Sequence, residues 1–222
     1  MRTARPSRPG TAQDHATEWI THSIIAGEYG PGDHIPQEDI AQKIGISLIP
    51  VRESLRRLEG LGQLTYQQQL GYFVTELTEE HLIPMFDIRK LLEEYAVKTA
   101  FPLITEEDID QASHHATICV AALADNDLVA LSRSHWSFFS AILCAEKQPL
   151  AIRLLRQLWN STNAYNVAFY SSDDGTEKAR AAILKAFRKK DLQAALEGFE
   201  EHRQRTKKVL IGIARVRSSH SE

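Results

Sequence analysis

The sequence predicts a mainly α-helical protein in two parts: a small N-terminal unit with one β-hairpin, and a larger unit made of helices alone. Apolar residues recur at the spacing of amphipathic helices over most of the 222 residues. A single pair of short β-prone runs flanks Gly71. After Thr78 the turn-rich sequence changes to long helical stretches with short polar breaks. The length is sufficient for one large or two small domains.

We therefore divide the chain into three segments. Residues 1–10 carry arginines, prolines and a glycine but nothing to bury, which is typical of a disordered arm. Residues 11–78 form the small unit. Residues 79–218 form the all-helical unit, which is about twice as large.

The small unit begins with two helices. Helical spacing of apolar residues predicts the first over 12–27, where Gly27 ends it. The second covers 37–44 and is ended by Gly45. A turn rich in glycine and proline separates the two helices.

A third helix and a hairpin complete the small unit. Ser47 is a suitable N-cap, and Pro50 lies in the first turn, where its missing N–H costs nothing. This helix runs to about residue 61. The β-prone runs at 64–66 and 71–74 then predict the hairpin.

The larger unit is expected to contain six helices. Pro84 removes an interior hydrogen bond, so the first of them either starts at Pro84 or is kinked there. The basic residues between Arg203 and Arg217 are expected to form a solvated end of the last helix. The predicted ranges are 84–101, 105–124, 127–146, 148–170, 175–189 and 191–215.

The order of elements in the small unit is that of a winged helix-turn-helix, in which the third helix enters the DNA major groove and the hairpin is the wing. Helical geometry turns Val51, Leu55 and Leu58 inward. It places Leu48, Arg52 and Arg56 on a neighbouring face, with Arg57 nearby. Arginines there can reach guanine edges or phosphates. A solvated helix face explains the same pattern, and the residues alone leave both readings open.

Composition excludes several classes of protein. No apolar run is long enough to span a bilayer, and the N-terminus lacks the apolar core of a signal peptide. The two cysteines, Cys119 and Cys144, cannot form a disulfide framework and are expected to be buried thiols of a cytoplasmic protein. The net charge of −3 shows no global basic excess, and positive charge gathers only locally, within residues 40–58.

The small unit resembles the winged helix-turn-helix domain of the GntR family of bacterial transcription regulators. The helical remainder is similar to the ligand-binding FCD domain of its FadR subfamily. These resemblances imply a homodimer, a palindromic operator and a small-molecule effector. The matching positions, in order and spacing, are Gly27, Pro31, Gly32, Asp33, Ile40-Ala41 and Pro50-Val51-Arg52-Glu53-x-Leu55-x-x-Leu58-Glu59.

The sequence departs from this family where DNA contacts are expected. The family's Ser-Arg-Thr-Pro is Ser47-Leu48-Ile49-Pro50 here, and the wing's Arg-Gly is Leu70-Gly71. An exposed Leu48 would meet a thymine methyl, although Leu48 and Ile49 packed beneath the wing are the alternative. Fewer phosphate contacts predict a shallower salt dependence of binding. The resemblance assigns DNA contact to Ser47, Leu48, Ile49, Arg52, Arg56, Arg57 and Gly71, most firmly to Arg52.

Four polar residues lie on the apolar stripes of the larger unit: Arg89, His135, Arg180 and His202. A buried arginine is costly unless an anion meets it. For Arg89 the anion is either Glu93, one turn later, or a ligand. A lone histidine on such a stripe is commonly a core residue, but four residues from separate helices favour a pocket.

Many relatives of the larger unit hold a divalent metal with one aspartate and three histidines. Here the resemblance places Phe139 and Arg180 at two of those positions, while His202 is retained. Phenylalanine cannot ligate, and arginine puts a positive charge where the cation would lie. We expect no metal cofactor. Instead, Arg180 and Arg89 would bind the carboxylate of an effector, with His135 and His202 as secondary contacts.

Three functions remain open. The first is a regulator whose effector changes the placement of two DNA-binding heads. A helical enzyme with a vestigial winged unit is the second, but we find no phosphate loop, nucleophile elbow or paired-carboxylate motif and expect no enzyme. The third is a protein-interaction module that no longer binds DNA, which Leu48 and Leu70 favour. The effector, the operator, the sign of regulation and the pathway are not encoded in recognisable motifs.

Overall fold

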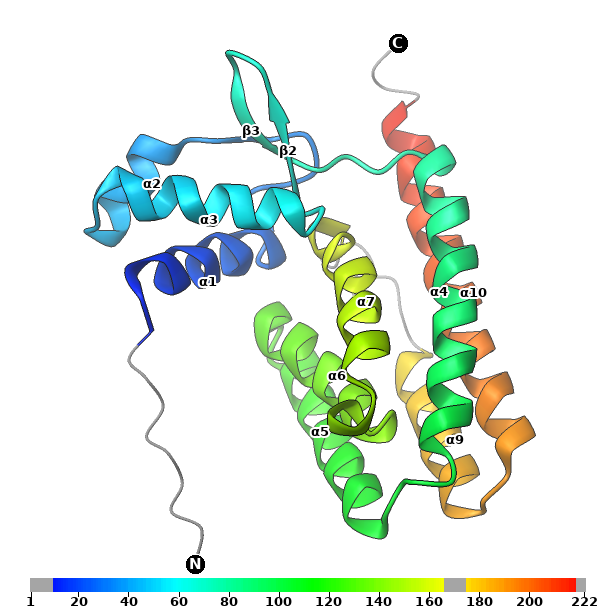
Figure 1. Cartoon of the computed structure of the whole chain (residues 1–222). Helices are drawn as coiled ribbons and strands as arrows, with labels where there is room; N and C mark the ends of the chain where they lie inside the picture. Colours follow the sequence, from blue (N-terminus) through cyan, green and yellow to red (C-terminus); the bar gives the residue numbers. More distant parts are fainter. Residues whose placement is uncertain (1–9, 166–174, 219–222) are drawn as a thin grey trace, which may run out of the picture.

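The computed structural model describes residues 10–165 and 175–218 (Figure 1). An N-terminal winged unit is followed by a helical unit, as predicted. The expected arm falls almost entirely outside the described residues. The helix expected over 148–170 ends at Asn160, within the described residues, so its predicted length is wrong.

Three helices of the winged unit lie close to their predicted positions: α1 (Ala12–Ile25), α2 (Gln37–Ile44) and α3 (Leu48–Gly60). At the start of α1, the Thr11 hydroxyl accepts a hydrogen bond from the Asp14 backbone N–H, and the Asp14 carboxylate accepts one from the Thr11 backbone N–H, each at 3.1 Å. This capping box satisfies two donors at the helix start. α1 ends two residues before Gly27.

The sheet has three strands, one more than predicted: β1 (His34–Ile35), β2 (Leu64–Gln67) and β3 (Gly71–Val74), in the order β1-β3-β2. All pairs are antiparallel. β1 escaped prediction because two residues are too short to show a period. Gly71 has φ of 98°, and a Cβ there would lie 3.2 Å from the His34 ring, so this position favours glycine.

The core of the winged unit lies between α1, α3 and the sheet. Val51, Leu55 and Leu58 are completely buried, which confirms their predicted inward orientation. From α1 they meet Ile20 and Ile24, which are equally inaccessible. Their burial fixes the opposite face of α3 toward solvent.

The helical unit begins earlier than predicted. α4 (Glu79–Ala100) includes Pro84 in its second turn, so the expectation that this helix starts at Pro84 is wrong. A proline at this place withdraws one hydrogen-bond donor, from the carbonyl of Glu80. Because Glu80 and Pro84 are both exposed, water can satisfy that carbonyl.

The remaining helices follow the predicted order. α6 ends before the predicted residue 146 because Cys144 adopts the left-handed conformation, with φ of 48°, and a short 3₁₀ helix, η1 (Ala145–Lys147), follows. A second 3₁₀ helix, η2 (Asn163–Tyr165), follows α7. The bounds are α5 (Glu106–Ala124), α6 (Leu128–Ile142), α7 (Pro149–Asn160), α9 (Thr176–Arg188) and α10 (Leu192–Ser218).

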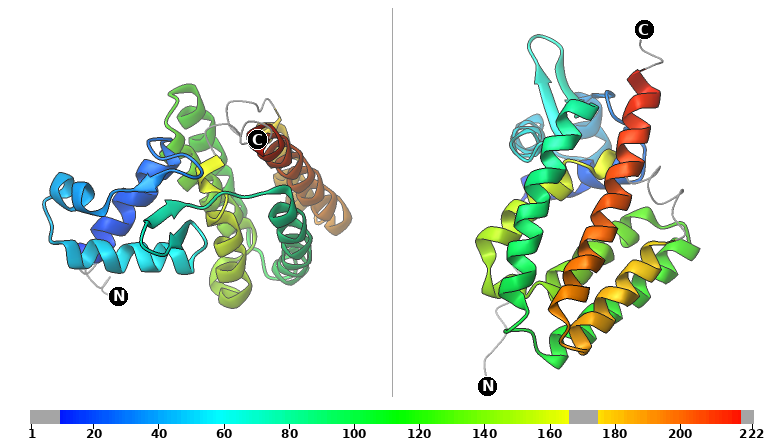
Figure 2. Two further views of the ribbon diagram at one scale, coloured as in Figure 1. Left: turned by 90° about the horizontal axis from the view of Figure 1, so that it is seen from above. Right: turned by 90° about the vertical axis from the view of Figure 1, so that its right-hand side faces the viewer.

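α4 and α10 run side by side along the helical unit (Figure 2, right). α10 also packs on α9, where a Cβ on Gly198 would come within 2.9 Å of the Ile183 side chain. α5 and α6 form a second helix pair. The largest apolar cluster fills the space between these helices and includes Phe138, Phe187 and Phe199.

The two units are tied together beside the chain that links them. The backbone N–H of Leu77 donates a hydrogen bond to the buried Tyr165 hydroxyl at 2.7 Å. The C-terminal turn of α10 reaches the winged unit, where Arg217 Nη2 donates to the carbonyl of Pro31 at 2.5 Å. None of the described helices is both long and apolar enough to traverse a bilayer.

Candidate functional site

The first turn of α3 presents its residues differently from expectation. Leu48 is half-buried and packs against the core of the winged unit, which favours the packed alternative for this residue over the exposed one. Ile49 is the outward residue, with 70% of its surface exposed. Ser47 is the N-cap residue, but its side chain makes no capping hydrogen bond. The first N–H groups of α3 are therefore available to an anion such as a phosphate.

Arg52 lies one turn further along the exposed face of α3. Its Nε donates to the Gln37 side chain at 3.1 Å, and its Nη2 lies 4.0 Å from the Glu38 carboxylate. The Arg52 side chain is 55% exposed. Because exposed ion pairs contribute little free energy, roughly 0–1 kcal/mol, a phosphate or a base edge can replace these partners cheaply.

Two more arginines on α3 have different surroundings. Arg56 is exposed and makes no ion pair within the described part of the chain. Arg57 forms an ion pair with Asp14 at 3.0 Å and so ties α3 to α1. Hydrogen bonds from Thr11 and then Arg57 hold the pKa of the Asp14 carboxyl below its usual value. Arg57 is therefore partly committed to the fold, whereas Arg56 is not.

The wing projects from the winged unit as a narrow hairpin (Figure 1). At its turn, Gln69 has φ of 66° and Leu70 is 62% exposed, followed by the half-buried Gly71. Tyr66, on β2, is also half exposed. The hairpin thus presents apolar surface and no positive charge, as its sequence indicates.

The four polar residues singled out in the helical unit are all buried, and the structure brings them together. Arg89 (α4), His135 (α6), Arg180 (α9) and His202 (α10) are at most 4% exposed. The ring centroids of the two histidines lie 5.2 Å apart. Both arginine charges act on both rings. We call these four residues the cationic cluster.

Aromatic rings enclose the cationic cluster. Trp159 on α7 lies edge-on to His135, with centroids 4.9 Å apart, and stacks nearly parallel to His202 at 6.5 Å. Phe139 lies 4.9 Å from His202. The Arg89 guanidinium lies 5.1 Å above the Trp159 ring. These low-polarity walls strengthen any charge interaction made inside them.

Both histidines of the cationic cluster are held in the neutral form. Burial, followed by the charges of neighbouring groups, puts the pKa of His135 well below its ordinary value. His202 has the same direction of pKa shift, caused first by burial and then by Arg89, Arg180 and Arg205. Each neutral ring offers one donor and one acceptor for a polar ligand.

The two arginines of the cationic cluster differ in their partners. Arg89 Nε donates to the Glu93 carboxylate at 2.6 Å, so the intrahelical pair considered from sequence does form. Arg180 has no such partner: its Nε and Nη1 atoms are buried without a hydrogen bond in the described part of the chain. A buried guanidinium in this state is costly, and an anionic ligand would offset the cost.

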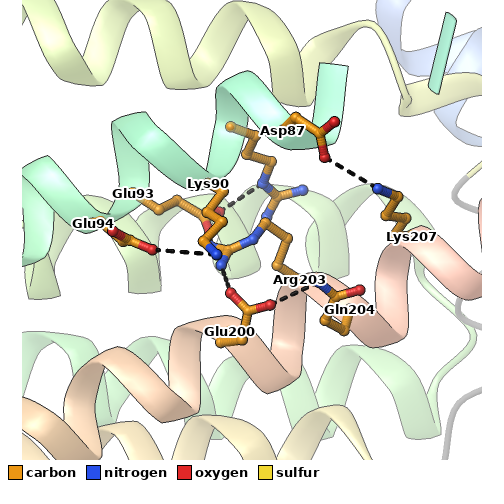
Figure 3. A network of polar contacts seen from close by, with 9 residues as sticks. Asp87, Lys90, Glu93, Glu94, Glu200, Arg203, Gln204 and Lys207 are labelled. Atoms are coloured by element: carbon orange, nitrogen blue, oxygen red, sulfur yellow. Dashed lines mark hydrogen bonds and ion pairs between the residues drawn. The ribbon is translucent and has the colours of Figure 1, made fainter. Parts of the chain in front are cut away.

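Glu93 also binds Arg203, which reaches it from α10 at 2.5 Å (Figure 3). Arg203 is 2% exposed and contacts Glu200 as well, so its predicted place in a solvated helix end is wrong. The four-residue spacing from Phe199 puts Arg203 on the buried stripe of α10, and this spacing is a signal that the sequence carries. Glu93 thus balances two buried arginines and has no charge left for Arg180.

A divalent metal does not fit the cationic cluster. Phe139 contacts both histidine rings and offers no ligand atom. No group of three or more possible ligand residues was found among the described residues. The positive field of Arg89 and Arg180, which disfavours protonation of His202, would equally oppose a metal cation.

Comparisons with known proteins agree with the fold. Residues 84–205 match the family described as "FCD domain", and residues 12–74 match "Bacterial regulatory proteins, gntR family". The chain is similar to the Escherichia coli HTH-type transcriptional regulator McbR, with 26% identity over 140 residues, which are 63% of each protein. It is also similar to the Uxu operon transcriptional regulator of the same species, with 25% identity over 220 residues, covering 89% of this chain and 86% of that protein.

The coverage of other relatives is smaller. The Nta operon transcriptional regulator of Aminobacter aminovorans is 31% identical over 85 residues, 38% of this chain and 40% of that protein. The chain thus matches less than two thirds of the length of each of the first three curated relatives.

Two solved structures show the same fold. That of E. coli McbR/YncC has a TM-score of 0.78 and 21% identity, and the alignment covers 91% of this chain and 98% of that one. A putative GntR regulator from Rhodococcus sp. RHA1 has a TM-score of 0.73 and 19% identity, with coverage of 90% and 97%.

Proposed function

The chain belongs to the GntR family of bacterial regulatory proteins and carries an FCD domain, and from this we propose that it is a transcription regulator that binds palindromic operator DNA as a homodimer. Its affinity for DNA changes when a small anion binds the cationic cluster. It acts in the cytoplasm, where bacterial DNA lies, and it is not an enzyme. The relatives named above are all described as transcriptional regulators, which supports this class of function.

The exposed face of α3 supports the DNA-binding part of the proposal. Burial of Val51, Leu55 and Leu58 directs Arg52 and Arg56 to solvent on the helix that enters the major groove in winged helix-turn-helix proteins. Arg52 is held only by weak surface contacts. The functional assignments of Ser47, Leu48, Ile49, Arg56, Arg57 and Gly71 remain predictions.

An apolar stripe on α4 supports the homodimer. Ile88, Leu91 and Tyr95 follow one another at helical spacing and are 53%, 68% and 59% exposed. α4 packs on α7, which exposes Leu150 to a similar extent. Exposed apolar stripes of this kind are typical of contact surfaces. A second copy is the occupant that a palindromic operator requires, because a two-fold axis relates its half-sites.

The single observation that carries the effector part is the buried Arg180 guanidinium, whose Nε and Nη1 lack partners among the described residues. A carboxylate could accept two parallel hydrogen bonds from it. The neutral imidazoles of His135 and His202 lie in the same cluster and would orient the rest of the molecule. Arg89 stacks on Trp159 and keeps its bond to Glu93, which makes it the secondary cation.

Selection from random DNA, followed by fluorescence anisotropy, tests DNA binding. We expect a palindromic sequence that binds far more tightly than unrelated DNA, and a smaller preference for this sequence in Arg52→Ala. Glu53→Ala, which alters an exposed neighbour on α3, is the matched control and should retain the preference. Failure to enrich any sequence would instead favour the protein-interaction module.

Sedimentation tests the dimer. Leu91→Glu should shift the protein toward a monomer because a charge would be buried in the contact. Leu103→Glu, at an exposed position beyond the end of α4, should leave the oligomeric state unchanged. A wild-type protein that remains monomeric when bound to a full palindrome would contradict the homodimer.

A thermal-shift screen of small carboxylates tests the effector. A ligand should raise the melting temperature of the wild-type protein but not of Arg180→Met, and it should change operator affinity. Equal stabilisation of both proteins would place the ligand elsewhere.

A further inference from the structure

Ile49 is the most exposed large apolar side chain in the described part of the chain. It belongs to the first turn of α3, and nothing in the fold requires it there. Its neighbour Leu48 packs on the core of the winged unit. Because this contact fixes the first turn of α3, Ile49 faces outward. Ile49 is thus 70% exposed beside the N-cap of α3, where its side chain can contact a partner outside the described chain.

Helical geometry places Ile49 in line with two arginines. Arg52 and Arg56 follow at three and seven residues, so all three side chains share one exposed face of α3. In helix-turn-helix proteins, the N-terminal residues of the recognition helix contact base edges in the major groove. Ile49 therefore lies at the end of α3 that penetrates deepest, ahead of both cations.

The chemistry of isoleucine restricts which base it can face. Isoleucine has no donor or acceptor, so a guanine or cytosine edge opposite it would lose water without gaining a hydrogen bond. Thymine is the base with a methyl group in the major groove, at C5, and apolar contact with this methyl is favourable. Isoleucine at this position thus both attracts thymine and disfavours bases with only polar groups at that edge.

We propose that Ile49 is a specificity-determining residue that contacts the C5-methyl group of a thymine in each operator half-site, beside the base pair that Arg52 contacts. The inference rests on the proposed function, since it requires the winged unit to bind DNA. It assigns to Ile49 the contact considered from sequence for Leu48, because Leu48 is half-buried against the core of the winged unit.

Replacing thymine by uracil tests the contact, because the two bases differ only in the methyl group. Operator DNA obtained by selection would be synthesised with uracil at one symmetric pair of positions at a time, and the Kd would be measured by anisotropy. At one pair the wild-type Kd should rise about fifteenfold, because each buried methyl is worth ~0.8 kcal/mol, about a fourfold change. At that pair Ile49→Ala should bind thymine and uracil DNA equally.

Three variants serve as controls. Leu103→Ala truncates an exposed apolar residue of the helical unit and should keep the full difference between thymine and uracil. Arg52→Ala should bind more weakly overall but keep that difference, because the methyl contact is separate. Ile49→Leu, which preserves the apolar character, should keep part of it.

Two results would overturn the inference while leaving the proposed function intact. One is tight operator binding with no position at which uracil matters to the wild-type protein. The other is a uracil effect that persists undiminished in Ile49→Ala. If selection yields no operator at all, the proposed function itself fails, and the two failures are thus distinguishable.

Discussion

Glu93 on α4 accepts a hydrogen bond from Arg203 on α10 at 2.5 Å, across the seam between the two helices. Its other oxygen accepts one from Arg89. One carboxylate therefore balances two buried guanidinium groups, and the side chains of all three residues are at most 5% exposed. Because buried charges are costly without a counter-charge, removing the central Glu93 should destabilise the fold strongly.

We predict that Glu93→Gln lowers the free energy of unfolding by about 3–5 kcal/mol, because Arg89 loses its counter-charge and Arg203 keeps only the more exposed Glu200. Urea denaturation of the purified protein measures this. Glu94→Gln is the matched control. Glu94 lies 3.9 Å from Lys90 in a solvent-exposed ion pair, so losing this pair should lower the free energy of unfolding by less than about 1 kcal/mol. Similar costs for the two variants would contradict the role of Glu93.

The free energy of unfolding should decrease as the pH is lowered through and below the ordinary titration range of histidine. His135 and His202 have lowered pKa values in the folded protein, so the unfolded chain binds more protons below about pH 6.5. The free energy of unfolding should then decrease as the pH falls from 6.5 toward the folded pKa values, by at most about 1.4 kcal/mol per pH unit for each ring. Urea denaturation at pH 7.5 and 5.5 measures the change.

The double variant His135→Phe/His202→Phe isolates this contribution. It keeps the aromatic packing of the cluster but removes both titrating rings. Its stability should fall less between pH 7.5 and 5.5 than that of the wild-type protein. An equal fall in both proteins would assign the pH dependence to other groups.

Arg52 and Arg57 should differ in their effects on DNA binding. Arg52→Ala should weaken operator binding by about 1–3 kcal/mol and relax sequence preference at one base pair. Arg57→Ala should weaken operator and unrelated DNA alike, and should also reduce stability slightly, because Arg57 is paired with Asp14. Anisotropy with matched and mismatched DNA distinguishes the two variants. Uniform weakening by Arg52→Ala would show that it contacts phosphate only.

Periodicity was enough to predict the winged unit because its core residues and its helix stops are local signals. Val51, Leu55 and Leu58 follow the helical period, and Gly45 takes a positive φ directly after α2. The same reasoning found Arg180 and His202, because polar residues on an apolar stripe are visible in sequence. It missed the end of α6, where Cys144 enters the left-handed region without a glycine to signal it.

Contacts between distant elements could not be predicted. Arg203 carries the same charge as the neighbouring basic residues of α10, and only the approach of α4 reveals that Glu93 meets it. Which of the adjacent residues Leu48 and Ile49 faces inward depends on how α3 is rotated about its axis. Packing of α3 on the core of the winged unit sets this rotation. Trp159 lies against the cationic cluster because α7 packs on α4, a tertiary contact without a local sequence signal.

The end of α10 should stabilise the position of the winged unit. Arg217 bonds to the carbonyl of Pro31 and to the Glu76 carboxylate, next to the chain between the two units. We predict that Arg217→Ala increases amide hydrogen exchange around Pro31 and Glu76. Arg188→Ala breaks a comparable surface pair, with Asp110, and should leave exchange there unchanged. Unaltered exchange in Arg217→Ala would mean that other contacts hold the units together.

Arg180 should lower the free energy of unfolding of the ligand-free protein, while it provides the binding site for an anionic ligand. In the described part of the chain its Nε and Nη1 atoms have no partner, so Arg180→Met should raise the free energy of unfolding of the ligand-free protein by about 1–3 kcal/mol. The expected rise in melting temperature is about 2–4 °C per kcal/mol. Calorimetry in a buffer without small carboxylates measures this change.

The same substitution should abolish stabilisation by added carboxylates, whereas Arg180→Lys, which keeps the charge but not the planar fork, should retain a weaker response. A residue that served only the fold would show the opposite sign, since its removal would cost stability. A lower melting temperature for Arg180→Met would therefore count against an anion site at this position. A gain in stability together with lost ligand response is the signature of a residue kept for its ligand.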